Sequence, residues 1–366
     1  MISENSNGLF EKIIDPKNIE KGLLEASLGK RHKKDVQYAL RYKDEIVKMI
    51  HESLSTMSWN PDHVHRIKII NDGVSKKKRE IVCPDFVQEH VIHHIIMRQC
   101  KEIFLKRFYK HSYASIPGYG GIENMVKYIR HIMKDRHRTK YFVKLDIKQF
   151  YNSIDPNTVY ESIKRIIRDK RVLRLFRLIL DSNLINHPDY GIIRRGTPIG
   201  LYTSQWFANI LLTRLDNQIK SFGKRVVPYY IRYNDDMIIF SPNKRKLKLV
   251  IKEIKRIILS LNLRLKHNAQ IHQVSKNKII FAGSKITYTN ITLTSKTFIK
   301  MRRYFIRLRK KLDAGKMINA YNAKRAMAYR ARCRSYDVHD FLASYSLPFR
   351  KFRRTISKND KKRRRA

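Results

Sequence analysis

Apolar and polar residues alternate most regularly in the middle of the chain. In residues 141–147 (YFVKLDI) the odd-numbered positions are Tyr, Val, Leu and Ile, and this period of two predicts a β-strand. Two further β-rich runs, 226–233 and 237–240, are separated only by the polar segment 234–236 (NDD). That spacing predicts a β-hairpin with an acidic turn.

Three stretches carry apolar residues at helical spacing. From Ser204 onward Phe, Ile and Leu recur on one face, and Thr203 or Ser204 is the expected N-cap. Segment 247–261 has one continuous apolar stripe, and segment 301–312 pairs such a stripe with a face of arginine and lysine. We therefore expect three amphipathic helices, the last of them strongly basic on its outer side.

The first 140 residues show mainly the patterns of helices and loops. A basic run at 76–79 leads into a short strand-like segment, Glu80–Cys83, which Pro84 ends. The 366 residues contain no internal repeat and no low-complexity linker, and their number allows two or three subdomains around a sizeable core.

Charge narrows the class of partner. The chain has 79 Lys and Arg against 31 Asp and Glu, a formal net charge of +48. Such a field attracts polyanions, of which nucleic acid is the commonest in a cell. Since 42% of the residues are hydrophobic, the charge decorates a globular core rather than a disordered tail.

Other features exclude several protein classes. The three cysteines are widely spaced, which favours neither a disulfide framework nor a zinc site. The N-terminal segment has no apolar core of the signal-peptide type. The longest uncharged stretch, 196–213, contains Pro198, Gln205 and Asn209 and is a poor membrane span. We expect a soluble cytoplasmic protein that binds nucleic acid and no membrane.

Acidic residues are scarce, so their positions are informative. Asp146 lies near the end of the strand predicted at 141–147, and Asp235 and Asp236 lie in the hairpin turn. If the hairpin pairs beside that strand, three carboxylates converge and repel one another unless cations bind, and hard oxygen ligands suit Mg²⁺. Two Mg²⁺ ions roughly 3.5–4 Å apart would activate an attacking 3′-hydroxyl and stabilise departing pyrophosphate. The alternative for Asp-Asp alone is ordinary turn chemistry.

Four segments resemble the motifs of reverse transcriptases and occur in the order that is typical of that family. The resemblance extends over roughly residues 20–345. The segments are a first palm motif (KLDIKQFYNSI, 144–154), a third palm motif (GTPIGLYTSQWFANILLTRLD, 196–216), a Tyr-x-Asp-Asp box (YNDD, 233–236) and a primer-grip segment (FAGSKI, 281–286). The resemblance implies an α+β right-hand polymerase with helical fingers, an antiparallel-sheet palm and a small helical thumb. It implies an N-terminal extension and fingers over 1–140, a palm over 141–290 with a finger-side insertion at about 156–195, and a basic helical thumb and C-terminal tail over 291–366.

The resemblance also implies the metal and nucleotide contacts. Asp146, Asp235 and Asp236 would hold two Mg²⁺ ions, with the backbone carbonyl of Ile147 as a further ligand. Tyr151 would lie under the incoming sugar, where a flat ring excludes a 2′-hydroxyl; the alternative is a packing tyrosine.

Other residues would contact the rest of the dNTP. Arg79 matches the fingers arginine that grips the triphosphate, a task that suits a planar guanidinium, although it also fits a solvated basic run. Lys266 would donate a proton to pyrophosphate. Ile199 and Gly200 would lie at the nucleotide.

A third set would hold primer and template. Ser204 and Gln205 belong to the third palm motif, and Phe281 and Gly283 would position the primer end. The basic face at 301–312, with Arg302 and Arg303, would lie against an RNA–DNA hybrid without base-specific contacts. Its alternative is a merely solvated helix face.

Within the family, the third palm motif is similar to that of diversity-generating retroelements. Many reverse transcriptases have Gln-Gly there and end the motif with Ser-Pro, whereas this chain has Ile199-Gly200 and Ser204-Gln205. Isoleucine cannot hydrogen-bond the incoming nucleotide, so discrimination between correct and incorrect pairs should relax. The resemblance implies cDNA that is mutated at template adenines, diversifies a gene segment by mutagenic retrohoming, and comes from a bacterial or phage-encoded element. It also implies a structured template RNA and a small basic accessory variability protein as a pentameric partner.

Alternatives remain within and outside the family. A group II intron maturase would extend past the thumb. A retron enzyme should have Asn-Ala-x-x-His between its first two palm motifs and Val-Thr-Gly near the C-terminus, whereas here NAQIH (268–272) follows the Asp-Asp box and the sequence has no Val-Thr-Gly. Retron-like and phage-defence reverse transcriptases stay open. A catalytically idle RNA-binding scaffold would show the same charge and fold, but it need not keep all three aspartates.

Overall fold

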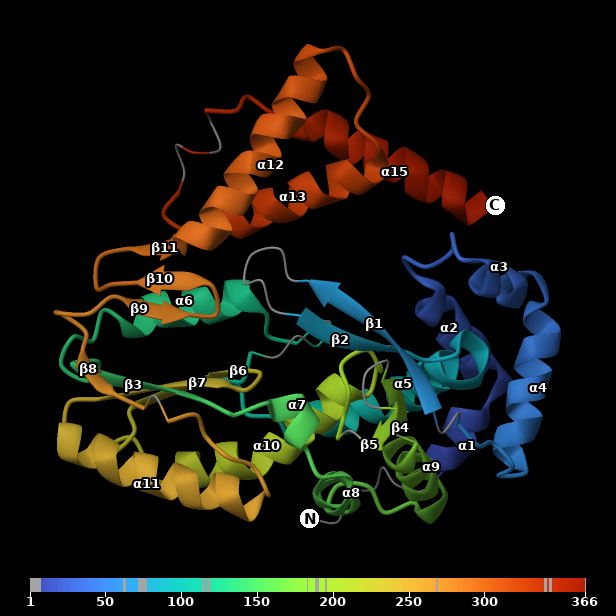
Figure 1. Ribbon diagram of the computed structural model, residues 1–366, viewed down its shortest axis with the longest axis horizontal. Helices are drawn as coiled ribbons and strands as arrows, with labels where there is room; N and C mark the ends of the chain where they lie inside the picture. The colour runs from blue at the N-terminus through green and yellow to red at the C-terminus, as the bar shows by residue number, and fades with distance from the viewer. Residues whose placement is uncertain are drawn as a thin grey trace.

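The computed structural model describes residues 8–61, 64–71, 78–113, 116, 119–182, 184–187, 191–194, 196–267, 269–338, 341 and 344–365. Lys76 and Lys77 of the basic run lie outside these residues. Figure 1 shows helices around three small sheets, with a group of C-terminal helices at the top. Within the described residues, no helix is both long and apolar enough to cross a membrane.

The N-terminal part of the chain is a block of packed helices on the right of Figure 1. Asp15 caps the second helix by accepting a hydrogen bond from the backbone N–H of Lys17 at 2.8 Å, and Pro16 is its first residue. The helices of the block are α1 (Leu9–Ile14), α2 (Pro16–Ser27), α3 (Lys34–Arg41), α4 (Lys43–Ser55), the π-helix η1 (Phe86–Val91) and α5 (Ile92–Leu105).

A four-stranded sheet lies beside this block, in the order β2-β1-β4-β5. It consists of β1 (Val64–Asn71), β2 (Lys78–Cys83), β4 (Leu184–His187) and β5 (Gly191–Arg194). β1 pairs with β2 antiparallel and with β4 parallel. The prediction of mainly helices and loops in the first 140 residues therefore missed β1. This strand pairs with β2, which follows it in the sequence, and with β4, which lies more than 100 residues further along the chain.

Helices from the segment 156–195 connect that sheet to the centre of the molecule. Asp155 caps α8 (Pro156–Lys164) by accepting hydrogen bonds from the backbone N–H groups of residues 157 and 158. α8 packs on the next helix, α9 (Lys170–Asp181), and on α10 (Ser204–Ser221).

The central sheet has the order β6-β7-β3-β8, and all its neighbours are antiparallel. Its strands are β3 (Tyr141–Asp146), β6 (Tyr229–Tyr233), β7 (Asp236–Ser241) and β8 (Ile271–Gln273). The strand at 141–147 and the hairpin are thus confirmed, although β6 begins at Tyr229 rather than at Val226.

Helices cover both faces of the central sheet, as alternating side chains require. Val143 and Leu145 of β3 belong to one core with α10 and α11 (Lys244–Ser260). Phe142 belongs to a second core with α6 (Ile122–Ile132). In Figure 1, α11 and α10 lie below the sheet and α6 lies above it.

The C-terminal part contains a three-stranded sheet and the top group of helices. The sheet, in the order β11-β10-β9, comprises β9 (Ile279–Phe281), β10 (Ser284–Ile286) and β11 (Ile291–Leu293). The helices are α12 (Ser295–Asp313), α13 (Ala320–Arg334) and α15 (Phe349–Arg365). The buried residues of α12, Met301, Tyr304, Phe305 and Leu308, are those of the apolar stripe, so the stripe prediction is confirmed. Helices combined with mostly antiparallel sheets make an α+β fold, as expected.

Candidate active site

Two of the three aspartates face each other across neighbouring strands. The register of β3 and β7 places Asp146 opposite Asp236. Tyr233 pairs with Asp236 at the end of the hairpin, so Asp235 lies in the two-residue turn beside them. The predicted pairing of the hairpin beside the first strand is thus confirmed, and it brings Asp146 and Asp236 together at the same end of two inner strands.

Burial and mutual repulsion disfavour the charged forms of these groups. Burial, followed by the charges of Asp235 and Asp146, raises the pKa of Asp236 to about 6. Burial raises the pKa of Asp235 as well, and the charge of Asp146 adds to that rise. Carboxylates held together in this way gain most from a bound cation.

Lys266 supplies one positive charge at this cluster. Its Nζ hydrogen-bonds to Oδ2 of Asp146, and its backbone N–H donates to the Asp146 carbonyl at 2.9 Å. The side-chain hydrogen bond to Asp146 raises the pKa of Lys266. Lys266 therefore contacts a carboxylate of the cluster directly. The sequence predicted Lys266 as a proton donor to pyrophosphate but did not predict this contact.

The donor set fits a hard divalent cation. Among the described residues, Oδ1 of Asp146 is buried and has no hydrogen-bond partner. The N–H of Lys148 and the carbonyl of Asp146 form hydrogen bonds with residues 264 and 266 on one side of the strand. Because backbone groups alternate in direction along a strand, the carbonyl of Ile147 points to the other side, toward β7. Nevertheless, no three His, Cys, Asp or Glu side chains in the described part of the chain form a ready-made metal cluster.

Tyr151 lies close to the acidic turn. It is in the short helix α7 (Phe150–Ser153) and is half-buried. Burial raises the pKa of its phenol to about 12, and the charge of Asp235 contributes to this rise. Its backbone carbonyl accepts a hydrogen bond from Thr197 at 3.1 Å, which ties α7 to the loop before α10.

That loop is pressed against β2. The N–H of Val82 donates to the carbonyl of Ile199 at 2.7 Å. Gly200 has φ +126°, and a Cβ there would lie 2.1 Å from the Val82 carbonyl oxygen. Only glycine fits such an approach. Arg79 is exposed on the same strand, so the structure brings Arg79, Ile199 and Gly200 to one strand and its neighbouring loop.

Ser204 makes its side-chain contact within its own loop. Its side chain is buried, and its hydroxyl donates to the carbonyl of Pro198 at 2.6 Å. It therefore holds the loop in place. The N-cap of α10 is Thr203, without a side-chain capping bond, and Gln205 is half-buried in the first turn.

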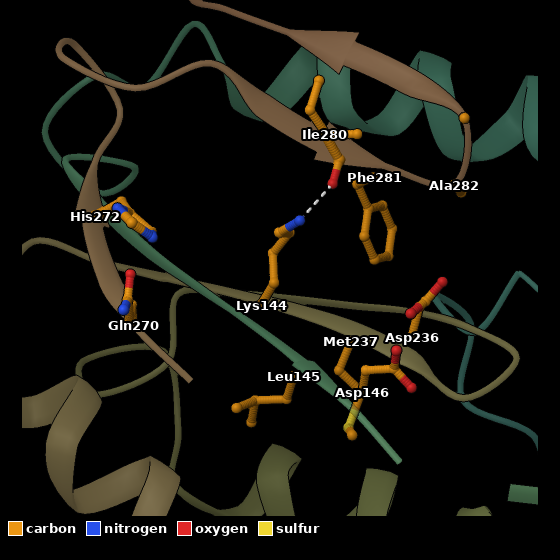
Figure 2. A pocket seen from close by; sticks show the side chains of 11 residues that line it. Lys144, Leu145, Asp146, Asp236, Met237, Gln270, His272, Ile280, Phe281 and Ala282 are labelled. Atoms are coloured by element: carbon orange, nitrogen blue, oxygen red, sulfur yellow. Dashed lines mark hydrogen bonds between the residues drawn. The ribbon is translucent and has the colours of Figure 1, made fainter. Parts of the chain in front are cut away.

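A cavity of about 280 Å³ adjoins the aspartates (Figure 2). Asp146 and Asp236 line one end, and Phe281 projects into it from β9. Lys144 crosses the cavity and donates to the Ile280 carbonyl at 2.8 Å. Gly283, with φ +77°, also lines the cavity, and the Arg332 guanidinium of α13 packs against it.

Arg302 and Arg303 lie on the exposed side of α12. This helix is above the sheet that carries Phe281 and Gly283 (Figure 1). Both arginines are therefore exposed residues of a helix in the C-terminal group, outside the sheet that carries Asp146 and Asp236.

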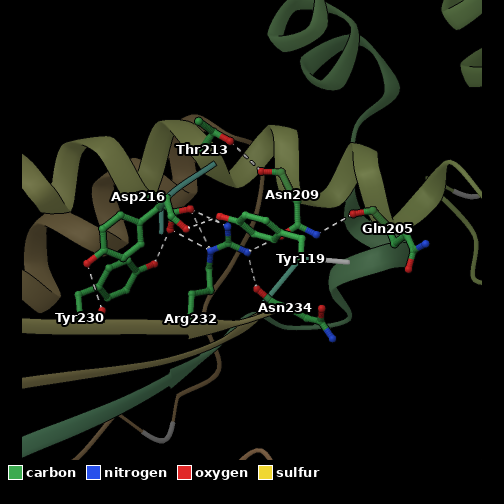
Figure 3. Close-up of polar contacts among 9 residues, drawn as sticks. Tyr119, Gln205, Asn209, Thr213, Asp216, Tyr230, Arg232 and Asn234 are labelled. Carbon is green, nitrogen blue, oxygen red and sulfur yellow. Dashed lines mark hydrogen bonds and ion pairs between the residues drawn. The ribbon is translucent and has the colours of Figure 1, made fainter. Parts of the chain in front are cut away.

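Arg232 and Asp216, which were not among the residues predicted from the sequence to form the site, make a buried ion pair beside Asn234 of the acidic turn (Figure 3). One signal was available: an arginine inside an apolar strand (YYIRY) and an aspartate at the end of an apolar helix each require a buried partner.

Known proteins resemble most of this region. Residues 71–286 match the family described as reverse transcriptase (RNA-dependent DNA polymerase). Group II intron-encoded protein LtrA of Lactococcus lactis subsp. cremoris is 24% identical over 216 residues, which are 57% of this chain and 35% of that protein. Retron Ec83 reverse transcriptase of Escherichia coli is 26% identical over 191 residues, which are 49% of this chain and 57% of that protein. The chain thus spans about a third of the first relative and just over half of the second.

Among solved structures, telomerase from Candida tropicalis in complex with a fragment of telomeric RNA has a TM-score of 0.50 at 16% identity. The likeness covers 71% of this chain and 52% of that one. At this identity it concerns the fold alone.

Proposed function

This chain belongs to the reverse transcriptase (RNA-dependent DNA polymerase) family, and from that premise we propose that it copies RNA into DNA by nucleotidyl transfer at Asp146, Asp235 and Asp236. The observation that carries the proposal is the cross-strand pairing of Asp146 with Asp236, beside the turn that holds Asp235. An idle scaffold has no use for three mutually repelling carboxylates, which weaken the fold unless a cation compensates them.

The three carboxylates and the carbonyl of Ile147 would hold two Mg²⁺ ions. Such a pair, when bound, activates the 3′-hydroxyl of a primer and stabilises the pyrophosphate that leaves. The chain itself contributes the placement of the oxygens at the end of β3 and the start of β7. Lys266, hydrogen-bonded to Asp146, would give its Nζ proton to the leaving group.

The cavity beside the aspartates is the proposed seat of the primer end. Phe281 and Gly283 line it together with Asp146 and Asp236, so a strand end placed there would reach the acidic cluster. The incoming dNTP would lie on the other side, with Tyr151 under its sugar. Arg79 on β2 and the Ile199-Gly200 loop would face its phosphates and base.

The net charge and the basic face of α12 support the nucleic-acid substrates. Arg302 and Arg303 are exposed with no acidic residue before Asp313 in this helix. We propose that they bind the backbone of the RNA–DNA hybrid, with Gln205 facing the template.

We further propose that the protein is the error-prone enzyme of a diversity-generating retroelement and mutates its cDNA at template adenines. Ile199, half-buried against β2, supports this, since an aliphatic side chain there offers no hydrogen bond to a nucleotide. A template-repeat RNA and a pentameric accessory protein are proposed from the resemblance alone. A retron-like role is the second candidate, favoured by the likeness to Retron Ec83 reverse transcriptase.

The experiment compares cDNA made from the element's own RNA by wild type and by Ile199→Gln, with Ile199→Leu as the matched control and with the accessory protein in parallel tubes. We expect errors concentrated at template adenines for wild type and Ile199→Leu, and roughly tenfold fewer for Ile199→Gln. Faithful wild-type cDNA would move the enzyme to a retron-like or defence role. An absence of cDNA in every tube would favour the idle RNA-binding scaffold.

A further inference from the structure

The guanidinium of Arg232 is buried between strand β6 and helix α10, beside Asn234 of the acidic turn (Figure 3). Arg232 is 1% exposed and Asp216 is fully buried. Nε of Arg232 donates to Oδ1 of Asp216 at 2.9 Å and Nη2 donates to Oδ2 at 2.6 Å, so the pair is bidentate. Asp216 is the ion-pair partner of Arg232, and the charge of Arg232 also acts on Asp235, whose pKa it lowers against the larger effect of burial.

The third guanidinium nitrogen reaches the turn itself. Nη1 donates to the carbonyl of Asn234 at 2.9 Å and to Oδ1 of Asn209 at 3.0 Å. Asn234 has φ +54°, a left-handed conformation that asparagine adopts more readily than most residues. The hydrogen bond therefore fixes the residue whose conformation aims Asp235 and Asp236.

The other sides of Arg232 are also held. Its backbone N–H donates to the carbonyl of His111 at 3.1 Å, and its carbonyl accepts from the N–H of Tyr113 at 2.7 Å. The hydroxyl of Tyr230 donates to Asp216 at 2.8 Å. The 111–113 segment thus fixes the backbone of Arg232, while Asp216, itself bonded to Tyr230, fixes its guanidinium.

We propose that Arg232, anchored by Asp216, is a positioning residue that holds the Asn234 turn so that Asp235 and Asp236 meet Asp146. The inference rests on the proposed function, since it names the support of the same site. It explains how carboxylates that repel one another stay together: the turn is fixed by a hydrogen bond at its own backbone, from a group whose charge is already paired.

Arg232→Lys tests the proposal in the full-length protein. Lysine keeps the charge beside Asp216, but one ammonium group cannot bind both Asp216 oxygens and also reach the Asn234 carbonyl. We expect kcat for RNA-templated extension to fall roughly tenfold to a hundredfold, with KM for primer–template within about twofold. Hydrogen exchange measured by mass spectrometry should rise in peptides that cover 233–237.

Asn18→Ala is the matched control, because it removes another buried polar side chain, hydrogen-bonded to the carbonyl of Ile13 at 2.9 Å in the N-terminal helices. It should lower the Tm without changing kcat per folded molecule or exchange at 233–237. If Arg232→Lys does not fold, Asp216→Asn, which loses the ion pair with little change of shape, is measured in the same way.

An unchanged kcat, or exchange that rises evenly over the whole chain with no excess at 233–237, would overturn the proposal. A wild-type protein without polymerase activity would refute the proposed function instead. The exchange experiment would then still decide whether Arg232 fixes the turn.

Discussion

Lys266 lies on Asp146: its Nζ hydrogen-bonds to Oδ2 of Asp146, and its backbone N–H donates to the Asp146 carbonyl. The backbone bond keeps the lysine at the acid even when the side chain swings away. A cation that binds Asp146 must therefore share this carboxylate with a resident positive charge, which has a measurable consequence.

Lys266→Met should tighten binding of a divalent cation and slow the reaction. Removal of a partly exposed charge next to Asp146 is worth about 1 kcal/mol, or roughly fivefold in affinity. Mn²⁺ titration followed by electron paramagnetic resonance measures the affinity, and single-turnover extension measures the rate. Lys266→Arg, which keeps the charge, should leave the affinity near that of wild type; weaker Mn²⁺ binding by Lys266→Met would contradict the arrangement.

Neutralising Asp236 should stabilise the metal-free protein at neutral pH. Its folded pKa of about 6 lies above the ordinary value of 3.8, so the folded state prefers the protonated form. The fold loses this stability as the pH rises from about 4 through 6. The free energy of unfolding of Asp236→Asn should then be about 1–3 kcal/mol higher than that of wild type above pH 6, and about equal to it below pH 4.

Urea denaturation in EDTA at pH 4 and pH 7.5 measures this difference. Added Mg²⁺ should raise the stability of wild type at pH 7.5 and leave Asp236→Asn nearly unchanged. A variant less stable than wild type at pH 7.5 would mean that the carboxylates do not repel one another.

Much of this site follows from the sequence, and what it leaves out is instructive. The alternation at 141–147 and the hairpin around Asn234 predict the sheet, and the positions of three scarce acids predict their meeting. This works because strand period and turn length are local properties. The amphipathic helices α10, α11 and α12 were predictable for the same reason.

What depends on distant segments was missed. Ser204 lies in the expected motif, yet only the folded loop shows that its hydroxyl is used by Pro198. The ion pair of Arg232 with Asp216 joins a strand to a helix, and β1 needs β4 as well as β2. Pattern along the chain carries no information about which buried polar groups find each other.

Gly200→Ala should damage the contact between the loop and β2. The new Cβ would lie 2.1 Å from the Val82 carbonyl oxygen at a φ of +126°, so we expect a loss of about 3 kcal/mol or more. Gly223→Ala is the matched control, since φ there is +68° with nothing within 4 Å, and about 1 kcal/mol is expected. Equal losses in urea denaturation would show that backbone conformation, and not the close approach, decides.

The double variant Arg302→Gln/Arg303→Gln should reduce the salt dependence of primer–template binding. Two lost phosphate contacts lower the slope of log Kd against log salt by roughly 1–2. Lys12→Gln/Lys17→Gln removes the same charge from exposed positions of the N-terminal helices and should leave the slope unchanged. Identical slopes for both double variants would mean that the basic face of α12 is only solvated.

The most direct test of the central claim is primer extension on an RNA template, with the products sequenced, for wild type and for the double variant Asp235→Ala/Asp236→Ala. Binding of primer–template is measured on the same samples. The structure predicts template-directed DNA from wild type, a loss of about a thousandfold or more in the variant, and similar binding by both. Equal extension by the two proteins, or RNA binding without any wild-type product, would contradict it.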